Sequence, residues 1–417
     1  MSDLKLMSSE EFDVLIVGAG PAGSFAAERL AQGGARVALF DGRPEGEPKA
    51  CGGGVTAKAL KAWPHLLGAV GRTVNELEMY SPSGKRLHLQ LDEPFAIYSR
   101  VAFDSYLRDR AVDAGANVFF EKISARGITR VEKKHSGEQE QSNWKLRSAS
   151  GGEWLGKMLV GADGANSAVG KMLAGSLPPC EMEVAFGYRA PLPERGDANT
   201  VVAFLPEWDG YAWAFPRLDH ISFGIATSQE TFDHDHLDRL LWNFIDRYYR
   251  CDLGKGPLIR PSEPELETIR SLLPMEIERY AARIPKLREG TLMERKTVGR
   301  DWALIGDAAG FADAVTGEGI YYALRSAELF AEMYLKGYPE NYDRAWRRDF
   351  GGDLARASKL RSHFYGTFLG SPFTNRMIEF AIFHKGVRRT LAELVLGNQG
   401  YMTLKKTLLT RAFLPFG

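Results

Sequence analysis

The sequence predicts an α/β fold in which a mixed sheet, built on a βαβ unit, carries an inserted antiparallel sheet and a helical C-terminal segment. Residues 12–30 combine an apolar strand, a glycine-rich turn and the start of a helix. Residues 175–285 contain short aromatic-rich strands, which are typical of an antiparallel sheet. Residues 340–417 have a mostly helical pattern.

The turn after the first strand has the spacing G-x-G-x-x-G, with glycine at Gly18, Gly20 and Gly23. In a dinucleotide-binding turn these glycines permit a tight bend, close approach of a pyrophosphate, and close packing of helix on strand. The N-terminus of the following helix offers free N–H groups to phosphate. A second strand, 36–40, ends at Asp41, whose carboxylate can accept hydrogen bonds from a ribose diol. This order predicts a Rossmann-like dinucleotide site.

The composition is that of a globular protein. The 417 residues are 44% hydrophobic and 25% charged with a net charge of zero, so no overall field recruits nucleic acid. The three cysteines, Cys51, Cys180 and Cys251, are far apart, so we expect no metal site, no disulfide and a reducing, cytoplasmic compartment. A polar start and the lack of a long apolar run predict neither a signal peptide nor a membrane span.

A second glycine-rich stretch, residues 49–54, contains Gly52, Gly53 and Gly54 directly after Cys51. Three successive glycines suit the close approach of a bulky planar ligand. Cys51 has two interpretations, a small buried apolar residue or a thiol beside a cofactor ring, and the sequence leaves both open.

Two later segments again lead from a strand into a glycine turn. Residues 159–167 deliver Asp163 into such a turn, so we expect the chain to pass the same ligand a second time. Residues 302–310 end a buried strand at Asp307, which can accept hydrogen bonds from ligand hydroxyls. Residues 316–335 add a further glycine turn and a helix, whose N-terminus suits an electron-rich ring edge.

The inserted region alternates large aromatic residues with alanine. Tyr211, Trp213 and Phe215 share one face if residues 210–215 form a strand. Such a face is either a stripe of the core or a flat wall of an apolar pocket. The other strands expected in this region are 184–188, 200–205 and 221–226.

The tail is basic. Residues 354–417 hold ten Lys or Arg against Glu379 and Glu393, interleaved with apolar residues. Basic amphipathic segments can dock on anionic membrane surfaces. The alternative is a tail packed on the main body with a solvated basic face.

Three blocks of residues, 18–23 with Asp41, 161–166 and 306–319, resemble the FAD-binding fold of aromatic hydroxylases such as p-hydroxybenzoate hydroxylase. The resemblance implies that Asp41 holds the adenosine ribose, where the family usually has the longer Glu. No second G-x-G-x-x-G turn occurs, so a second nucleotide would have only a transient site.

The same resemblance implies roles for four further positions. Arg100 would lie near the flavin and pyrophosphate, Asp307 would meet the ribityl chain, and the backbone after Thr316 would face the pyrimidine edge. Asp163 would support the FAD site or the approach of a reduced nicotinamide. The predicted cofactor-binding residues are Gly18, Gly20, Pro21, Ala22, Gly23, Asp41, Gly42, Arg43, Cys51, Gly52, Gly53, Gly54, Arg100, Asp163, Gly306, Asp307, Gly317, Gly319 and Ile320.

Within this superfamily, residues 49–54, 211–216 and 306–322 resemble geranylgeranyl reductases, and the resemblance covers residues 11–335. It implies an FAD-dependent reductase of isolated C=C bonds in polyprenyl groups of lipid or isoprenoid substrates. The FAD would be reduced by NAD(P)H or by a ferredoxin-like donor.

The resemblance also points to catalytic and substrate-binding residues. Cys51, Tyr211 and Trp213 are the catalytic candidates, with Cys51 and Tyr211 as possible proton sources. Tyr211, Trp213 and Phe215 would form the wall against the prenyl chain. Two alternatives stay open: a flavin monooxygenase or halogenase acting on an aromatic, and a non-catalytic electron carrier to quinone, for which no iron–sulfur cysteine cluster is present.

The predicted domains follow from these assignments. A long lipid substrate favours contact of the tail with the inner face of the membrane. The FAD-binding domain is expected at 10–75, 98–174 and 286–335, the substrate-binding domain at 76–97 and 175–285, and the helical C-terminal region at 336–417.

Overall fold

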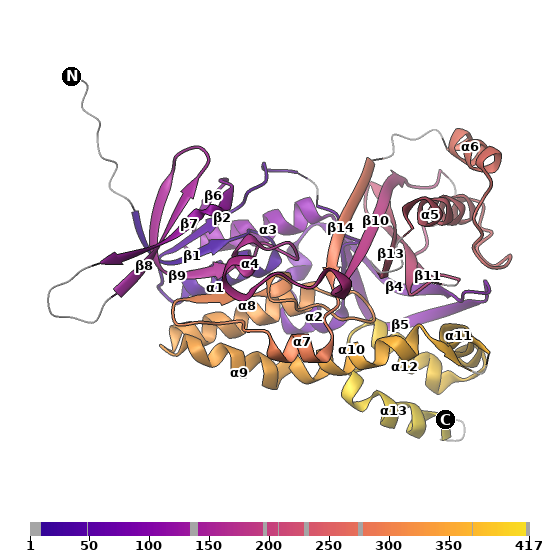
Figure 1. Ribbon diagram of the computed structural model, residues 1–417. Coiled ribbons are helices and arrows are strands. Elements are labelled where there is room, and N and C mark those ends of the chain that lie inside the picture. The colour runs from indigo at the N-terminus through magenta and orange to yellow at the C-terminus, as the bar shows by residue number, and fades with distance from the viewer. Residues whose placement is uncertain are drawn as a thin grey trace.

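Two sheets at opposite ends of an elongated body organise the molecule, with helices α8 to α10 along one side (Figure 1). Helices α11 to α13 continue beneath the second sheet. The computed structural model describes residues 10–47, 49–133, 141–194, 198–206, 208–228, 233–273, 278–368 and 370–413.

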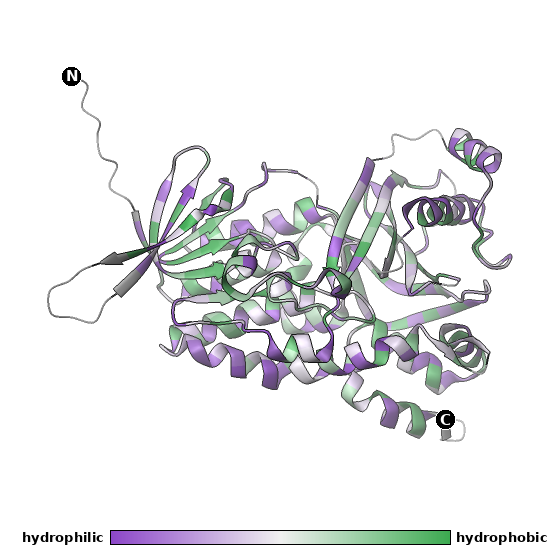
Figure 2. Ribbon diagram, viewed as in Figure 1, coloured by the Kyte–Doolittle hydropathy of each residue, from purple (hydrophilic) through white to green (hydrophobic). Residues whose placement is uncertain are grey.

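The first sheet is mixed and has the order β6-β2-β1-β9-β8-β7, with β15 also paired to β9. The pairs among β6, β2, β1, β9 and β15 are parallel, whereas β7 and β8 join by antiparallel pairing. Apolar residues dominate its central strands (Figure 2). The strands are β1 (Glu10–Val17), β2 (Val37–Phe40), β6 (Asn117–Phe119), β7 (Ile123–Lys133), β8 (Gln141–Ser148), β9 (Glu153–Gly161) and β15 (Trp302–Leu304).

Helix α1 (Pro21–Gln32) follows β1 as predicted and packs between α3 (Arg100–Asp113) and α8 (Ile320–Leu335). The turn before it leaves no room for side chains. A Cβ on Gly23 would lie 1.8 Å from the carbonyl oxygen of Gly18, and Gly18 itself has φ +107°. The two glycines therefore fix how closely α1 approaches the sheet.

The second sheet has the order β14-β10-β13-β12-β11-β4-β5-β3. Its strands confirm the four that the sequence predicts in residues 175–285. The expectation of a wholly antiparallel sheet is wrong at one place, because β4 and β11 pair in parallel. The strands are β3 (Gly54–Val55), β4 (Gly71–Tyr80), β5 (Arg86–Tyr98), β10 (Met182–Pro191), β11 (Val201–Phe204), β12 (Gly210–Pro216), β13 (His220–Ser228) and β14 (Glu278–Pro285).

Two helices that the sequence analysis missed, α5 (His234–Tyr249) and α6 (Glu263–Leu272), belong to the core of this second sheet. Helix α5 buries apolar residues at helical spacing, including Leu237, Leu241 and Phe244. They contact the outer face of the sheet, so only its other face is free to line a cavity.

The C-terminal region is helical, as predicted. Helices α11 (Phe373–Phe383) and α12 (Lys385–Val395) pack on β5 through a shared apolar cluster that includes Ile378 and Leu391. These helices thus pack on the main body. Among the residues that the structure describes, no helix has both the length and the apolar character needed to cross a bilayer. The other helices are α2 (Ala57–Ala62), α4 (Ala168–Ala174), α7 (Glu289–Glu294), α9 (Tyr342–Trp346), α10 (Gly352–Phe364) and α13 (Tyr401–Phe413), with short 3-10 turns at Pro64–Gly68, Pro179–Glu181, Gly306–Ala308 and Pro339–Asn341.

A buried ion pair ties this region to the second sheet. Arg361 of α10 lies 2.6 Å from the carboxylate of Glu183 in β10, and both side chains are nearly inaccessible. Arg361 also donates to the carbonyl of Ala314, in the loop before α8. The loop, the sheet and the tail therefore meet at one guanidinium.

The substitution Gly23→Ala should destabilise the protein by about 1–3 kcal/mol or more, because the new methyl overlaps the carbonyl of Gly18. Urea unfolding would measure the loss. The control is Gly290→Ala in α7, where a Cβ meets nothing within 4 Å; stability there should be unchanged or slightly raised. Equal stability of the two variants would contradict the close-packing argument.

Candidate functional site

A cavity between the two sheets is lined by residues from every part of the chain. One end is polar and is formed by the α1 turn, Lys49, Arg100 and Asp307. The other end is apolar and reaches the tail helices. The apolar lining residues are Met79, Phe95, Val202, Phe204, Ile284, Val315, Phe364, Met377, Leu391, Leu394 and Val395.

Two cations face the glycine turn at the polar end. A Cβ on Gly20 would lie 3.6 Å from Lys49 Nζ and 3.9 Å from Arg100 Nη2. Arg100 donates two hydrogen bonds of 2.8 Å to Asp104. Lys49 Nζ has no ion-pair partner within the described residues, and burial, with Arg100 nearby, lowers its pKa. A pyrophosphate between the turn and these cations would compensate the buried charge, so the residues fit a dinucleotide.

Asp307 faces the same end of the cavity. Burial raises the pKa of its carboxyl, whereas Lys49 and Arg100 lower it. A Cβ on Gly319 would lie only 3.1 Å from Asp307 Oδ1, so the glycine leaves this carboxylate accessible. No described residue donates to it, which leaves its oxygens available to ligand hydroxyls.

The second-strand acid, Asp41, is buried at the end of β2, outside this cavity. It accepts a hydrogen bond of 3.2 Å from the N–H of Arg43, and Arg108 lies 3.5 Å from its carboxylate. Because β1 and β2 are parallel neighbours, the end of β2 lies beside the α1 turn that follows β1. The carboxylate therefore remains suited to the ribose that the motif predicts.

The carboxylate of Asp163 is engaged by groups of its own segment. Its carboxylate accepts hydrogen bonds from Ser167 Oγ, from the N–H of Ala168 at 2.6 Å and from the N–H of Val169 at 3.3 Å. These contacts hold the start of α4 and occupy the carboxylate. The segment reaches the cavity through its neighbours Ala162 and Gly164.

The Cys51–Gly54 stretch lies against the aromatic face of β12. A Cβ on Gly52 would lie 3.1 Å from the ring of Phe215 and 3.3 Å from Trp213 Nε1. Gly53 has φ +82° and donates from its N–H to Cys51 Sγ at 3.3 Å. The thiol is half-buried and lines the cavity, so the structure favours the interpretation of Cys51 as a residue of the site.

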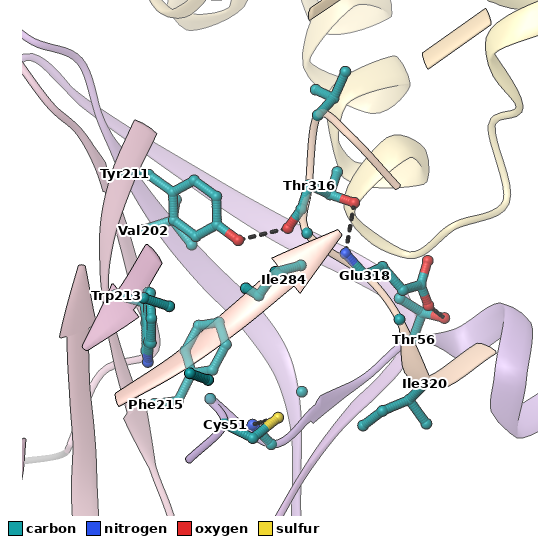
Figure 3. Close-up of a pocket in the computed structure, with 18 of the residues that line it drawn as sticks. Cys51, Thr56, Val202, Tyr211, Trp213, Phe215, Ile284, Thr316, Glu318 and Ile320 are labelled. Carbon is teal, nitrogen blue, oxygen red and sulfur yellow. Dashed lines mark hydrogen bonds between the residues drawn. The ribbon is translucent and has the colours of Figure 1, made fainter. Parts of the chain in front are cut away.

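The aromatic residues of β12 form one wall, opposite the loop that carries Thr316, Glu318 and Ile320 (Figure 3). Neighbouring ring centroids are 6.0 Å apart for Tyr211 and Trp213 and 6.5 Å apart for Trp213 and Phe215. The alternating alanines, Ala212 and Ala214, pack with α5 on the other face. The stripe is therefore the wall of a pocket on one side and core on the other.

Tyr211 connects the wall to the loop. Its hydroxyl donates a hydrogen bond of 2.5 Å to the carbonyl of Thr316, and burial together with Glu183 raises its pKa. A Cβ on Gly317 would lie 3.2 Å from this hydroxyl. The short distance and the φ of +70° both favour glycine at that position.

Glu318 is a site residue that the sequence analysis missed. Its carboxylate accepts a hydrogen bond of 2.6 Å from Thr56 Oγ1, and burial, with Asp313 nearby, raises its pKa to about 7. The available signal was a lone acid between Gly317 and Gly319. A carboxyl that is partly protonated near neutral pH can donate or accept a proton in the cavity.

The predicted site residues divide into two sets. Those that line the cavity are Gly20, Pro21, Ala22, Cys51, Gly52, Gly53, Gly54, Arg100, Tyr211, Trp213, Phe215, Asp307, Gly317, Gly319 and Ile320. Those that do not are Gly18, Gly23, Asp41, Gly42, Arg43, Asp163 and Gly306.

Comparison with known proteins accounts for this arrangement. Residues 11–188 match the family model of an FAD binding domain. A chloroplastic geranylgeranyl diphosphate reductase of Oryza sativa subsp. japonica is 31% identical over 356 residues, which cover 81% of this chain and 69% of that protein. The chain belongs to the geranylgeranyl reductase family. It is an FAD-dependent oxidoreductase, and the polar end of its cavity fits that cofactor.

Other geranylgeranyl reductases are similar over most of their length. A digeranylgeranylglycerophospholipid reductase of Methanothrix thermoacetophila is 26% identical over 380 residues, or 84% of this chain and 87% of that one. A geranylgeranyl bacteriochlorophyll reductase-like structure from Thermoplasma acidophilum has a TM-score of 0.72 at 22% identity, covering 97% of this chain and 100% of that chain. A flavin-dependent brominase has a TM-score of 0.64 at 17% identity, covering 96% and 98%. Both solved structures therefore have the same fold as this chain.

The pKa of Glu318 predicts a pH-dependent stability. The carboxyl has a pKa of 4.5 when unfolded and about 7 when folded, so the folded chain holds the proton more tightly. Relative to Glu318→Gln, the wild type should lose stability as the pH rises from about 4.5 to about 7, and the difference should then stay constant. Denaturant unfolding at a series of pH values, with FAD in excess, would measure it. A pH-independent difference would contradict the assignment.

Proposed function

We propose that this protein reduces isolated C=C bonds in polyprenyl chains of lipid or isoprenoid substrates. The supporting observation is a single cavity that joins the polar cofactor end to a long apolar arm. The apolar lining comes from the second sheet and from the tail helices, which contribute Met377, Leu391 and Val395. A long apolar chain is the ligand class that such a lining favours.

The names of the relatives support this substrate class, because they refer to geranylgeranyl diphosphate and to digeranylgeranylglycerophospholipid. FAD, when bound, supplies the two-electron chemistry, drawing on NAD(P)H or a ferredoxin-like donor. The protein's own contribution is to orient the chain, exclude water and supply a proton.

The aromatic wall would orient the reacting bond. Trp213 is 5% exposed and lies over Gly224, where a Cβ would approach within 2.0 Å of the indole. The indole is thereby held flat in the wall. Aromatic faces contact an alkene without hydrogen-bonding demands and tolerate developing positive charge on carbon.

Three side chains could supply the proton. Tyr211 donates its hydroxyl hydrogen to Thr316, so proton transfer from it would require loss of that hydrogen bond. Cys51 accepts from Gly53 and keeps its own S–H free of that contact. Glu318, across the cavity, is held by Thr56 and has a pKa suited to proton exchange. We assign the proton to Cys51, with Glu318 as its replenishing acid.

We also propose that the tail contacts a membrane surface, since a prenyl lipid must leave its bilayer to enter the cavity. Phe383 is 87% exposed, Met402 is 67% exposed and Phe380 is 53% exposed. Basic residues accompany them on α11 to α13, which suits anionic lipid. They are Arg376, Lys385, Lys405 and Lys406.

Anaerobic reduction of the purified flavoprotein, followed by a geranylgeranyl substrate, should give products that gain two hydrogens per reduced bond by mass spectrometry. The reason is that each C=C bond takes up one hydride equivalent, which bound FAD would supply, and one proton, which the site would supply. Oxygenated or halogenated products that require O₂ would instead support a monooxygenase or halogenase. Electron transfer to quinone without alkene reduction would support the carrier function.

Trp213→Phe should raise the KM for a prenyl substrate severalfold if the wall binds the chain, because a phenyl ring covers less of the chain than an indole does. The matched control is Trp242→Phe, since Trp242 is also 5% exposed with a buried indole nitrogen but belongs to α5, outside the cavity. Steady-state kinetics would compare them. An equal change in KM in the two variants would mean that Trp213 contributes only to core packing and not to substrate binding.

Cys51→Ala should lower kcat strongly while FAD binding and the KM change little, because the thiol supplies a proton after the substrate is bound. Flavin absorbance would report FAD content and product analysis would report turnover. Unchanged kcat would remove Cys51 from the mechanism and transfer the role to Glu318.

A further inference from the structure

A second cavity of about 770 Å³ opens beside the first and shares Lys49 and Arg100 with it. It lies between the start of α3 and the strand ends of β10, β12 and β14 in the second sheet. Its remaining lining combines charged and polar residues with three apolar ones. These residues are Ser99, Val101, Arg189, Ala190, Pro191, Arg217, Asp219, His220 and Glu278.

The balance of charge in this cavity is positive. Four basic side chains, Lys49, Arg100, Arg189 and Arg217, line it. Arg100 is paired with the buried carboxylate of Asp104, so the uncompensated positive charge comes chiefly from Lys49 and Arg217. The carboxylates that line the cavity are Asp219 and Glu278. Both carboxylates are mostly exposed, with side chains 78% and 60% accessible. They are therefore screened by water, whereas the cations are held inside.

Arg217 is the centre of this arrangement. It is 4% exposed, and no described carboxylate pairs with it. One terminal nitrogen donates to the carbonyl of Cys51 at 2.8 Å, and Nε has no partner in the described structure. Burial lowers its pKa, and Arg189 and Arg100 add to that effect. An uncompensated buried guanidinium is costly, so the site is incomplete without an anion.

The neighbours of Arg217 extend its hydrogen-bond network: His220 accepts from Arg217 and donates to Asp219, so the donors left for an anion are those of the basic side chains. Arg217 Nη1 lies 3.4 Å from His220 Nε2, and His220 Nδ1 lies 2.7 Å from Asp219. Arg189 pairs with Glu278 at the rim. Arginine forks match phosphate oxygens in pairs, and the several cations suit an anion with more than one charge.

We propose that this second cavity binds the diphosphate group of a ligand whose reacting end reaches the first cavity. Arg217 and Arg189 would be its principal contacts, because Lys49 and Arg100 also face the α1 turn. A diphosphate can come from a prenyl diphosphate substrate or from a nicotinamide dinucleotide that delivers electrons. The first source rests on the proposed function, whereas the second does not.

Calorimetric titration of inorganic pyrophosphate into the FAD-loaded protein tests the site without any turnover. The wild type should bind, with affinity that falls as salt is added. Arg189→Gln and Arg217→Gln should each weaken binding at least about tenfold. The control is Arg250→Gln, an exposed arginine directly after α5 that is also ion-paired. Unchanged binding in both cavity variants, or no binding by the wild type, would overturn the proposal.

Kinetics with Arg189→Gln then separate the two sources. If the substrate is held here, the KM for geranylgeranyl diphosphate should rise while that for geranylgeraniol, which lacks phosphate, should not. If the dinucleotide is held here, the KM for NADPH should rise, while the rate of alkene reduction with dithionite as the electron donor should not change. Arg217→Lys, which keeps a charge beside Cys51, checks that lost binding is not local unfolding; it should retain part of the affinity. If the protein reduced no alkene at all, the pyrophosphate titration would still test the site independently.

Discussion

The backbone contact between the α1 turn and the end of β9 is the constraint on which the site depends. A Cβ on Gly18 would lie 2.4 Å from the carbonyl oxygen of Ala162, and one on Gly23 would overlap Gly18 itself. Strand, turn and helix are therefore packed backbone against backbone. This closeness brings Gly20, Ala162 and Asp307 to one edge of the first sheet, where a dinucleotide can lie against main-chain N–H groups.

The second sheet separates the cavity from the core that it forms with α5. Its outer face is covered by α5 and its inner face supplies the aromatic wall, so each residue of β12 faces either core or cavity according to the strand period. The polar end of the cavity holds unpaired charge, and the opposite end is lined by apolar side chains. Cys51, Tyr211 and Glu318 line the same cavity, so they are placed to act on a prenyl chain if the proposed function is correct.

The tail closes this arrangement. The pair between Arg361 and Glu183 fixes α10 against β10, while α11 and α12 complete the apolar arm with Met377 and Leu391. Breaking a buried ion pair leaves one charge without compensation, so the tail is held at a defined position. The region that the sequence marked only as basic and helical is therefore also a wall of the cavity.

The sequence by itself determined the elements whose signals are local. The spacing of Gly18, Gly20 and Gly23, the acid at Asp41 and the alternation at Tyr211 to Phe215 depend only on turn geometry and strand period, and the fold contains each of them. It did not reveal α5 or α6, although α5 carries apolar residues at helical spacing. Only the tertiary structure decided that Asp163 accepts hydrogen bonds from the start of α4, that β4 pairs in parallel with β11, and that Glu318, Lys49 and Arg217 belong to cavities. Strand pairing, burial and the proximity of other charges depend on segments that are far apart in the chain. No local sequence pattern encodes them.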